Sequence, residues 1–137
     1  FQREEAEHLS AEMVQRLMVT TKQVKVDDDI ILGIKNLVRS TRPEDELCPE
    51  HLKSAIWYGA GPRAGISLIS VAKALALIEQ KEEVRWAHVR RLAKPVLRHR
   101  VRLTAQAMRD AMDEDAFVDQ MLERLEAKHK NLAQGVA

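Results

Sequence analysis

The apolar stretch between residues 64 and 80 constrains the fold more than any other feature of the sequence. A helix there carries apolar side chains nearly all round: Ile66, Leu68, Ile69, Val71, Ala72, Ala74, Leu75, Leu77 and Ile78. A helix that is apolar on every face is typical of the buried centre of a domain. Pro62 suits its first turn, because the N–H that proline lacks would have no partner there. We therefore expect a central helix with other helices packed around it.

Shorter amphipathic patterns predict the helices around this centre. Apolar side chains recur at steps of three and four, with charged residues between them. The patterns lie in residues 1–18 (Ala6, Leu9, Met13, Leu17), 27–42, 86–93 and 115–128. Pro43 is expected to end the second helix, and Pro95 to break or kink the third. The stretches 24–26 and 82–85 are expected to be extended links.

Composition agrees with an all-α fold. Aromatic residues make up only 4% of the 137 residues, and straight-chain residues, which lose little rotamer freedom in a helix, dominate. The hydrophobic fraction of 45% is sufficient for one core. We predict a single domain over residues 1–137, folded as a small bundle of about five to six unequal helices.

Charge and cysteine content exclude little. The 22 basic and 21 acidic residues nearly cancel, so only local charge could favour a nucleic-acid or membrane partner. Cys48, the single cysteine, fits a reducing compartment, and no ligand spacing predicts a metal site. No apolar run approaches the ~20 residues that cross a bilayer. The chain enters a helical pattern at once from Phe1, without a methionine, and we expect a cytoplasmic piece of a longer protein.

The loop before the central helix carries the most informative polar residue, Arg63. The loop consists of Gly59, Ala60, Gly61 and Pro62, and Arg63 follows in the first helical turn. A helix N-terminus attracts anions and disfavours cations, so an arginine there is easier to explain if it shares a bound phosphate. The alternative is a solvated surface arginine, which spacing alone slightly favours.

A basic segment between residues 85 and 102 is the second feature. Its cations, uninterrupted by any acid, are Arg85, Arg90, Arg91, Lys94, Arg98, Arg100 and Arg102. Nucleic-acid contact is one interpretation, because lysine and arginine neutralise phosphates. Trp86 is the only aromatic residue available for base stacking, and it is expected in the core. A solvated or subunit-facing helix is therefore the favoured interpretation.

Several blocks together resemble the C-terminal lid of MoxR-type AAA+ ATPases. They are Thr41-Arg42, Tyr58 to Ala64, the alanine-rich Val71 to Ala76, Val89 to Leu92, and Ala93 to Arg100, which contains Val-Leu-Arg-His-Arg. The similarity covers roughly residues 24–125. Position 61 is glycine where many members have serine, so Gly61 is assigned no nucleotide contact.

The resemblance implies a role that depends on an absent partner domain. It equates Arg63 with the sensor-2 arginine, which contacts the γ-phosphate of ATP and acts in catalysis, and places Gly59, Ala60, Pro62 and Arg63 in the nucleotide-binding site. ATP and Mg²⁺ would be held by the P-loop core of the same parent chain. Members form hexameric rings and often act as chaperones or maturation factors for partners with von Willebrand A domains.

The missing sequence motifs agree with such a fragment. Without a P-loop or paired acids after a buried strand, the chain could sense nucleotide but would not hydrolyse it alone. We then expect an exposed apolar face that the absent core would cover, with Ile56, Trp57 and Tyr58 as candidates. Two alternatives stay open, namely a nucleic-acid module that uses residues 85–102 and a free-standing helical adaptor without nucleotide.

Overall fold

The computed structural model describes residues 9–128, and this part of the chain is mainly helical. Its seven helices are α1 (Ala11–Gln23), α2 (Asp28–Ser40), α3 (Glu50–Lys53), α4 (Pro62–Ile78), α5 (Trp86–Leu97), α6 (Ala105–Arg109) and α7 (Glu114–Lys128). Its short strands are β1 (Lys25–Val26), β2 (Ile56–Tyr58), β3 (Glu83–Val84) and β4 (Arg102–Leu103). The predicted all-α class is confirmed. Ala6 and the tail after Lys128 lie outside the described residues.

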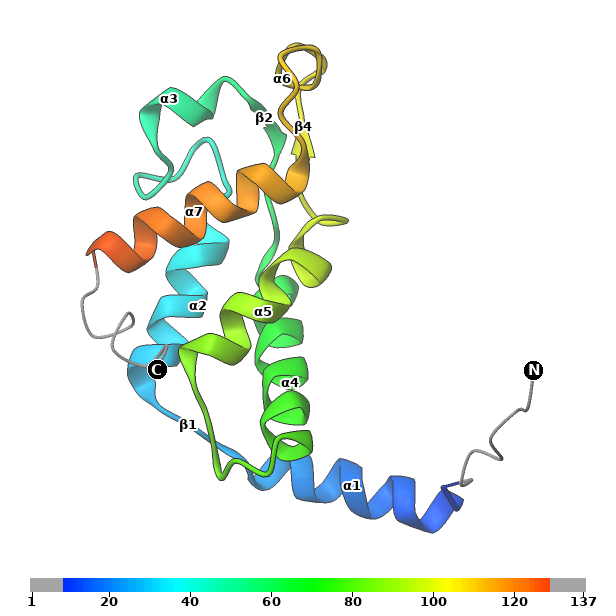
Figure 1. The fold of residues 1–137 in the computed structure, drawn as a ribbon. Helices are drawn as coiled ribbons and strands as arrows, with labels where there is room; N and C mark the ends of the chain where they lie inside the picture. The colour runs from blue at the N-terminus through cyan, green and yellow to red at the C-terminus, as the bar shows by residue number, and fades with distance from the viewer. Residues whose placement is uncertain (1–8, 129–137) are drawn as a thin grey trace.

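Helix α4 is the centre of the bundle and contacts α1, α2 and α5 (Figure 1). Its buried face carries small residues and one leucine at steps of four: Ala64, Leu68, Ala72 and Ala76. The expectation that this helix is buried all round is wrong, because Ile66 is 65% exposed and Ile78 is 77% exposed. Its neighbours cover only part of the helix, and an apolar side faces solvent.

Helix α5 runs through Pro95 without ending there, so of the two predicted alternatives, a break or a kink, the break is wrong. Trp86 is buried as predicted, and Val89, Ala93 and, beyond the proline, Leu97 are buried too. Proline removes one helical hydrogen bond, but Pro95 lies only two residues from the end of the helix. Burial on both sides of the proline against α4 and α7 holds the last turn in place.

Helix α7 packs its predicted apolar face into the same core. Its buried residues are Phe117, Val118, Met121, Leu122 and Leu125. The helix contacts both α2 and α5, so it closes the side of the bundle opposite α1 (Figure 1). Helix α1, in contrast, has no buried residue and extends away from the bundle.

Two small strand pairs fasten distant parts of the chain. β1 and β3 pair in parallel, with Lys25 opposite Glu83, so the extended links predicted at 24–26 and 82–85 are confirmed and lie together. β2 and β4 pair antiparallel with an irregularity between Ile56 and Tyr58, and this pair was not predicted. β2 leads directly into the loop before α4, so its pairing fixes one end of that loop.

Among the described residues, no helix combines the length and apolarity required to span a membrane.

Candidate functional site

The loop from Gly59 to Gly61 delivers Arg63 to the first turn of α4. Gly61 is the N-cap residue, with an extended backbone (φ −82°, ψ 171°), and Pro62 is the first helical residue. The cap offers no side-chain acceptor to the N–H groups of that turn. Arg63 is exposed, whereas Ala60 and Ala64 on either side are buried. The structure therefore brings the predicted site residues together at a helix N-terminus, where backbone N–H groups and a guanidinium can meet an anion.

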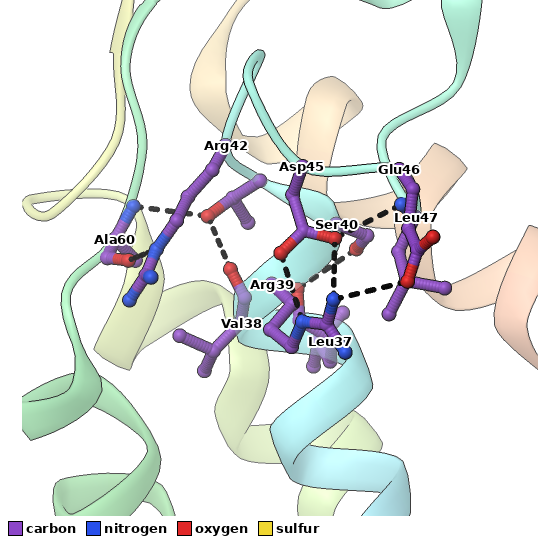
Figure 2. Close-up of polar contacts among 10 residues, drawn as sticks. Leu37, Val38, Arg39, Ser40, Arg42, Asp45, Glu46, Leu47 and Ala60 are labelled. Carbon is purple, nitrogen blue, oxygen red and sulfur yellow. Dashed lines mark hydrogen bonds and ion pairs between the residues drawn. The ribbon is translucent and has the colours of Figure 1, made fainter.

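The end of α2 holds this loop through the backbone of Ala60 (Figure 2). The Ala60 N–H donates to Thr41 Oγ1 at 2.9 Å, and the Thr41 hydroxyl donates to the Val38 carbonyl at 2.7 Å. Arg42 Nε donates to the Ala60 carbonyl at 2.9 Å. Both polar groups of a fully buried backbone unit are thus satisfied from one helix end. We call this arrangement of Thr41, Arg42 and Ala60 the α2 clamp.

Sequence reasoning missed this clamp. Thr41 and Arg42 entered only through the family resemblance, as residues at the end of a helix, and no contact was predicted for them. The available signal was a threonine and an arginine directly before Pro43, at a point where a helix end leaves carbonyl groups to satisfy.

Gly59 allows the loop and α2 to touch. A Cβ atom on Gly59 would lie 2.4 Å from the Thr41 carbonyl oxygen and 2.8 Å from the Arg42 Cα atom. No glycine among the described residues has a positive φ. Close approach, not backbone conformation, therefore explains glycine at position 59. A Cβ on Gly61 would meet no atom within 4 Å.

An ion pair closes the turn that follows the clamp (Figure 2). Arg39 Nε donates to Asp45 Oδ2 at 2.8 Å, and its terminal nitrogen donates to Asp45 Oδ1 at 3.1 Å and to Glu46 at 3.3 Å. Asp45 Oδ1 also accepts from the Leu47 N–H at 3.0 Å. The hydrogen bonds from Arg39, and then from the Leu47 N–H, hold the pKa of Asp45 below its ordinary value.

The basic segment forms four ion pairs within the chain, while five of its seven cations are exposed, which fits its interpretation as a solvated helix. Four of its seven cations bind acids: Arg90 with Glu126, Arg91 with Glu79, Lys94 with Asp119, and Arg98 with Asp115. Three of these acids lie on α7. The segment thus joins α5 to its neighbours, because its charges face acids of the same domain.

Two other polar residues, Cys48 and His88, are buried within the fold. Cys48 is buried, and this burial, with smaller contributions from nearby acids, raises the pKa of its thiol. The buried His88 was missed: its Nδ1 accepts from the Arg85 N–H at 2.9 Å, so Nε2 carries the proton toward Glu79 Oε2, 3.1 Å away. Over residues 9–128 no cluster of three or more His, Cys, Asp or Glu could hold a metal.

Only part of the predicted apolar face is exposed. Trp57 and Tyr58 are exposed as expected, but Ile56 is buried, and the pairing of β2 with β4 is irregular between Ile56 and Tyr58. Ile66 and Ile78 of α4 are exposed in addition.

Comparison with known proteins places this fold and loop in a family. Residues 50–121 match the model of the AAA lid domain, which is more than half of the chain, and the chain belongs to this family. It is, more particularly, the C-terminal lid of a MoxR-type AAA+ ATPase.

Two relatives carry that assignment. Chaperone MoxR1 of Mycobacterium tuberculosis is 31% identical over 90 residues, which are 66% of this chain and 24% of that protein. A crystal structure of a Cytophaga hutchinsonii protein assigned as an ATPase has 28% identity and a TM-score of 0.73, and covers 81% of this chain and 33% of its own. The chain thus spans about a quarter of the curated relative and a third of the solved one.

Proposed function

We propose that this chain is the nucleotide-sensing lid of its ATPase and that Arg63 contacts the γ-phosphate of ATP. The observation that carries the proposal is the exposed Arg63 in the first turn of α4, at the end of a loop held by buried hydrogen bonds, in a chain of the AAA lid family. The donor set fits a phosphate, since the N-terminus of α4 has no side-chain cap and favours an anion, and arginine supplies a planar fork.

In this proposal the lid and an ATPase core share the work. Residues 1–137 act as one lid domain, and a P-loop core in the same parent chain holds ATP and Mg²⁺. The bound Mg²⁺ would neutralise charge on the phosphates. Arg63 stabilises the charge that develops on the γ-phosphate, and loss of that contact after hydrolysis shifts the lid. Gly59, Ala60 and Pro62 keep Arg63 at the helix start.

The wider assembly is part of the same proposal. The parent would form a hexameric ring, as the resemblance implies, and act as a cytoplasmic chaperone or maturation factor, with von Willebrand A-domain proteins as the client class. The relative named a chaperone supports this direction. The exposed Trp57 and Tyr58 directly precede the site loop and supply apolar surface for a core to cover.

A nucleic-acid module on residues 85–102 has little support, because four of the seven cations there already pair with acids of the chain. A helical adaptor without nucleotide is the second candidate. It would leave Arg63 replaceable without consequence, so one experiment separates it from the lid proposal.

The test is steady-state ATP turnover of the full-length parent with Arg63→Ala. We expect turnover to fall about tenfold or more, which corresponds to ~1.4 kcal/mol of lost transition-state stabilisation. Arg63→Lys should recover only part of the rate, because an ammonium lacks the planar fork.

Arg109→Ala is the matched control, since Arg109 is exposed and, within residues 9–128, its side chain hydrogen-bonds only Gln106 of its own helix. Circular dichroism checks folding of each variant. Unchanged turnover in a folded Arg63→Ala variant would reject the lid proposal and favour the adaptor.

A further inference from the structure

We infer that Thr41 and Arg42 are positioning residues for Arg63, and that α2 sets the place of the sensor arginine through the clamp on Ala60. The inference rests on the proposed function of Arg63. It assigns a role in ATP turnover to two side chains that directly follow another helix and lie about twenty residues earlier in the chain.

The first argument is that the clamp fixes the loop at a single backbone unit. Thr41 is 0% exposed, and its hydroxyl accepts from the Ala60 N–H while it donates to Val38. Arg42 Nε donates a hydrogen bond to the carbonyl oxygen of the same residue, Ala60. A displacement of Ala60 would leave a buried donor and acceptor without partners, and such groups are costly to leave unsatisfied. The loop therefore has one preferred place against α2.

The second argument is the close packing beside the clamp. Gly59 lies so near the Thr41 carbonyl that a Cβ atom would reach within 2.4 Å of it. The backbone of the loop thus rests directly on the backbone of α2, with no side chain between them to give way. The clamp and this contact together restrain two successive residues.

The third argument is the short path from the clamp to the guanidinium. Ala60 precedes Arg63 by three residues, and Pro62 between them has a fixed φ. A shift at Ala60 is therefore passed to the start of α4 and to the base of the Arg63 side chain. Misplacement of a catalytic group by about 1 Å can cost on the order of a hundredfold in rate, so the clamp has a large possible effect on turnover.

The clamp is itself supported on its far side. The Arg39 fork binds both carboxylate oxygens of Asp45 and closes the turn that contains Arg42. The last turn of α2 is therefore held from before and after the clamp residues. The end of α2 thus holds Thr41 and Arg42 in place for their hydrogen bonds to the loop.

The experiment is a double-mutant cycle on ATP turnover of the full-length parent, with Thr41→Val and Arg63→Ala alone and together. Valine keeps the size and branching of threonine but removes the hydroxyl. If Thr41 acts through Arg63, we expect Thr41→Val to lower kcat about tenfold in the wild type, with KM for ATP within about threefold. In the Arg63→Ala background the same change should cost less than about twofold.

Two variants provide controls. Thr41→Ser keeps the hydroxyl and should retain most of kcat. Ser40→Ala removes the neighbouring buried hydroxyl, which donates to the Leu37 carbonyl of its own helix, and should leave kcat unchanged. If Thr41→Val does not fold by circular dichroism, Arg42→Gln replaces it in the same cycle, because the partly exposed Arg42 is less exacting for folding.

Each outcome decides between the two proposals. Non-additive losses in the cycle support the positioning role. Equal factors in both backgrounds, or full kcat in Thr41→Val while Arg63→Ala is impaired, overturn the positioning role and leave the proposed function intact. Full kcat in Arg63→Ala overturns both, since there is then no sensor to position.

Discussion

Gly59 and Gly61 lie two residues apart in one loop, yet their surroundings predict opposite responses to a methyl group. A Cβ on Gly59 would press into the backbone at Thr41 and Arg42, whereas a Cβ on Gly61 would enter open space. Backbone atoms held in buried hydrogen bonds cannot move aside as a flexible side chain can. We expect Gly59→Ala to lower the free energy of unfolding by roughly 1–3 kcal/mol, the usual cost of overpacking.

Urea denaturation of the chain measures this effect, and Gly61→Ala serves as its matched control. Gly61→Ala should change the free energy of unfolding by less than about 1 kcal/mol, because the methyl finds space while the altered helix cap and the stiffer unfolded chain act in opposite directions. A similar loss in both variants would show that close approach at Gly59 is not what matters.

At this scale the sequence predicted the place of Arg63 at a helix start, because that signal is local: a glycine-rich loop, a proline and an arginine in register with the helix. The phosphate contact of Arg63 stays a prediction that rests on the family resemblance. The contact between Thr41 and Ala60 joins residues 19 positions apart. No periodicity or local spacing encodes which helix end meets which loop, so the clamp required the fold.

The turn after α2 gives a prediction for a single element, carried by Asp45. Its pKa is lowered in the folded chain, chiefly by the Arg39 hydrogen bonds. As pH falls, the unfolded chain therefore takes up this proton before the folded chain does. The stabilisation is present above the ordinary carboxylate pKa of about 4 and is lost as pH falls through the lower folded value.

The measurement is the free energy of unfolding of the wild type, Asp45→Asn and Arg39→Gln between about pH 6 and pH 2. The wild type should lose stability more steeply over the acid range than either variant, because only it carries the ion pair. Parallel slopes in all three would mean that this pair does not govern the acid response.

Element boundaries show where sequence patterns reach their limit. The stripes of α2 and α7 were read correctly, because each has one apolar face with charges opposite. Pro95 was misjudged, since local proline rules do not count the burial of Leu97 beyond it. The short β2–β4 pair was missed, because two or three residues carry no usable pattern and their pairing is decided by tertiary contacts.

For the whole molecule, the exposed apolar side of α4 yields a prediction about what stabilises the isolated chain. Ile66 is largely exposed, while Leu68, two residues on, is fully buried. Ile66→Gln should therefore change the free energy of unfolding by less than about 0.5 kcal/mol. Leu68→Ala, the buried comparison on the same helix, should cost about 2–5 kcal/mol.

Urea denaturation of both variants at one protein concentration is the check. A loss in Ile66→Gln comparable with that of Leu68→Ala would mean that this side of α4 is already covered in solution. The sequence predicted α4 as the centre of the domain but did not predict its exposed apolar side. An apolar stretch has the same composition whether the surface that covers it belongs to the same chain or to another.

The parallel pairing of β1 with β3 has a consequence for how the chain is made. Lys25 meets Glu83, so the first strand has no partner until a residue 58 positions later has been synthesised. At the usual rate of about 5–20 residues per second, this is a delay of roughly 3–12 s at the ribosome. During that interval β1 lacks the strand that ties it to the bundle. Newly made chains would thus close this strand pair only after α4, which lies between the two strands in the sequence, has been synthesised.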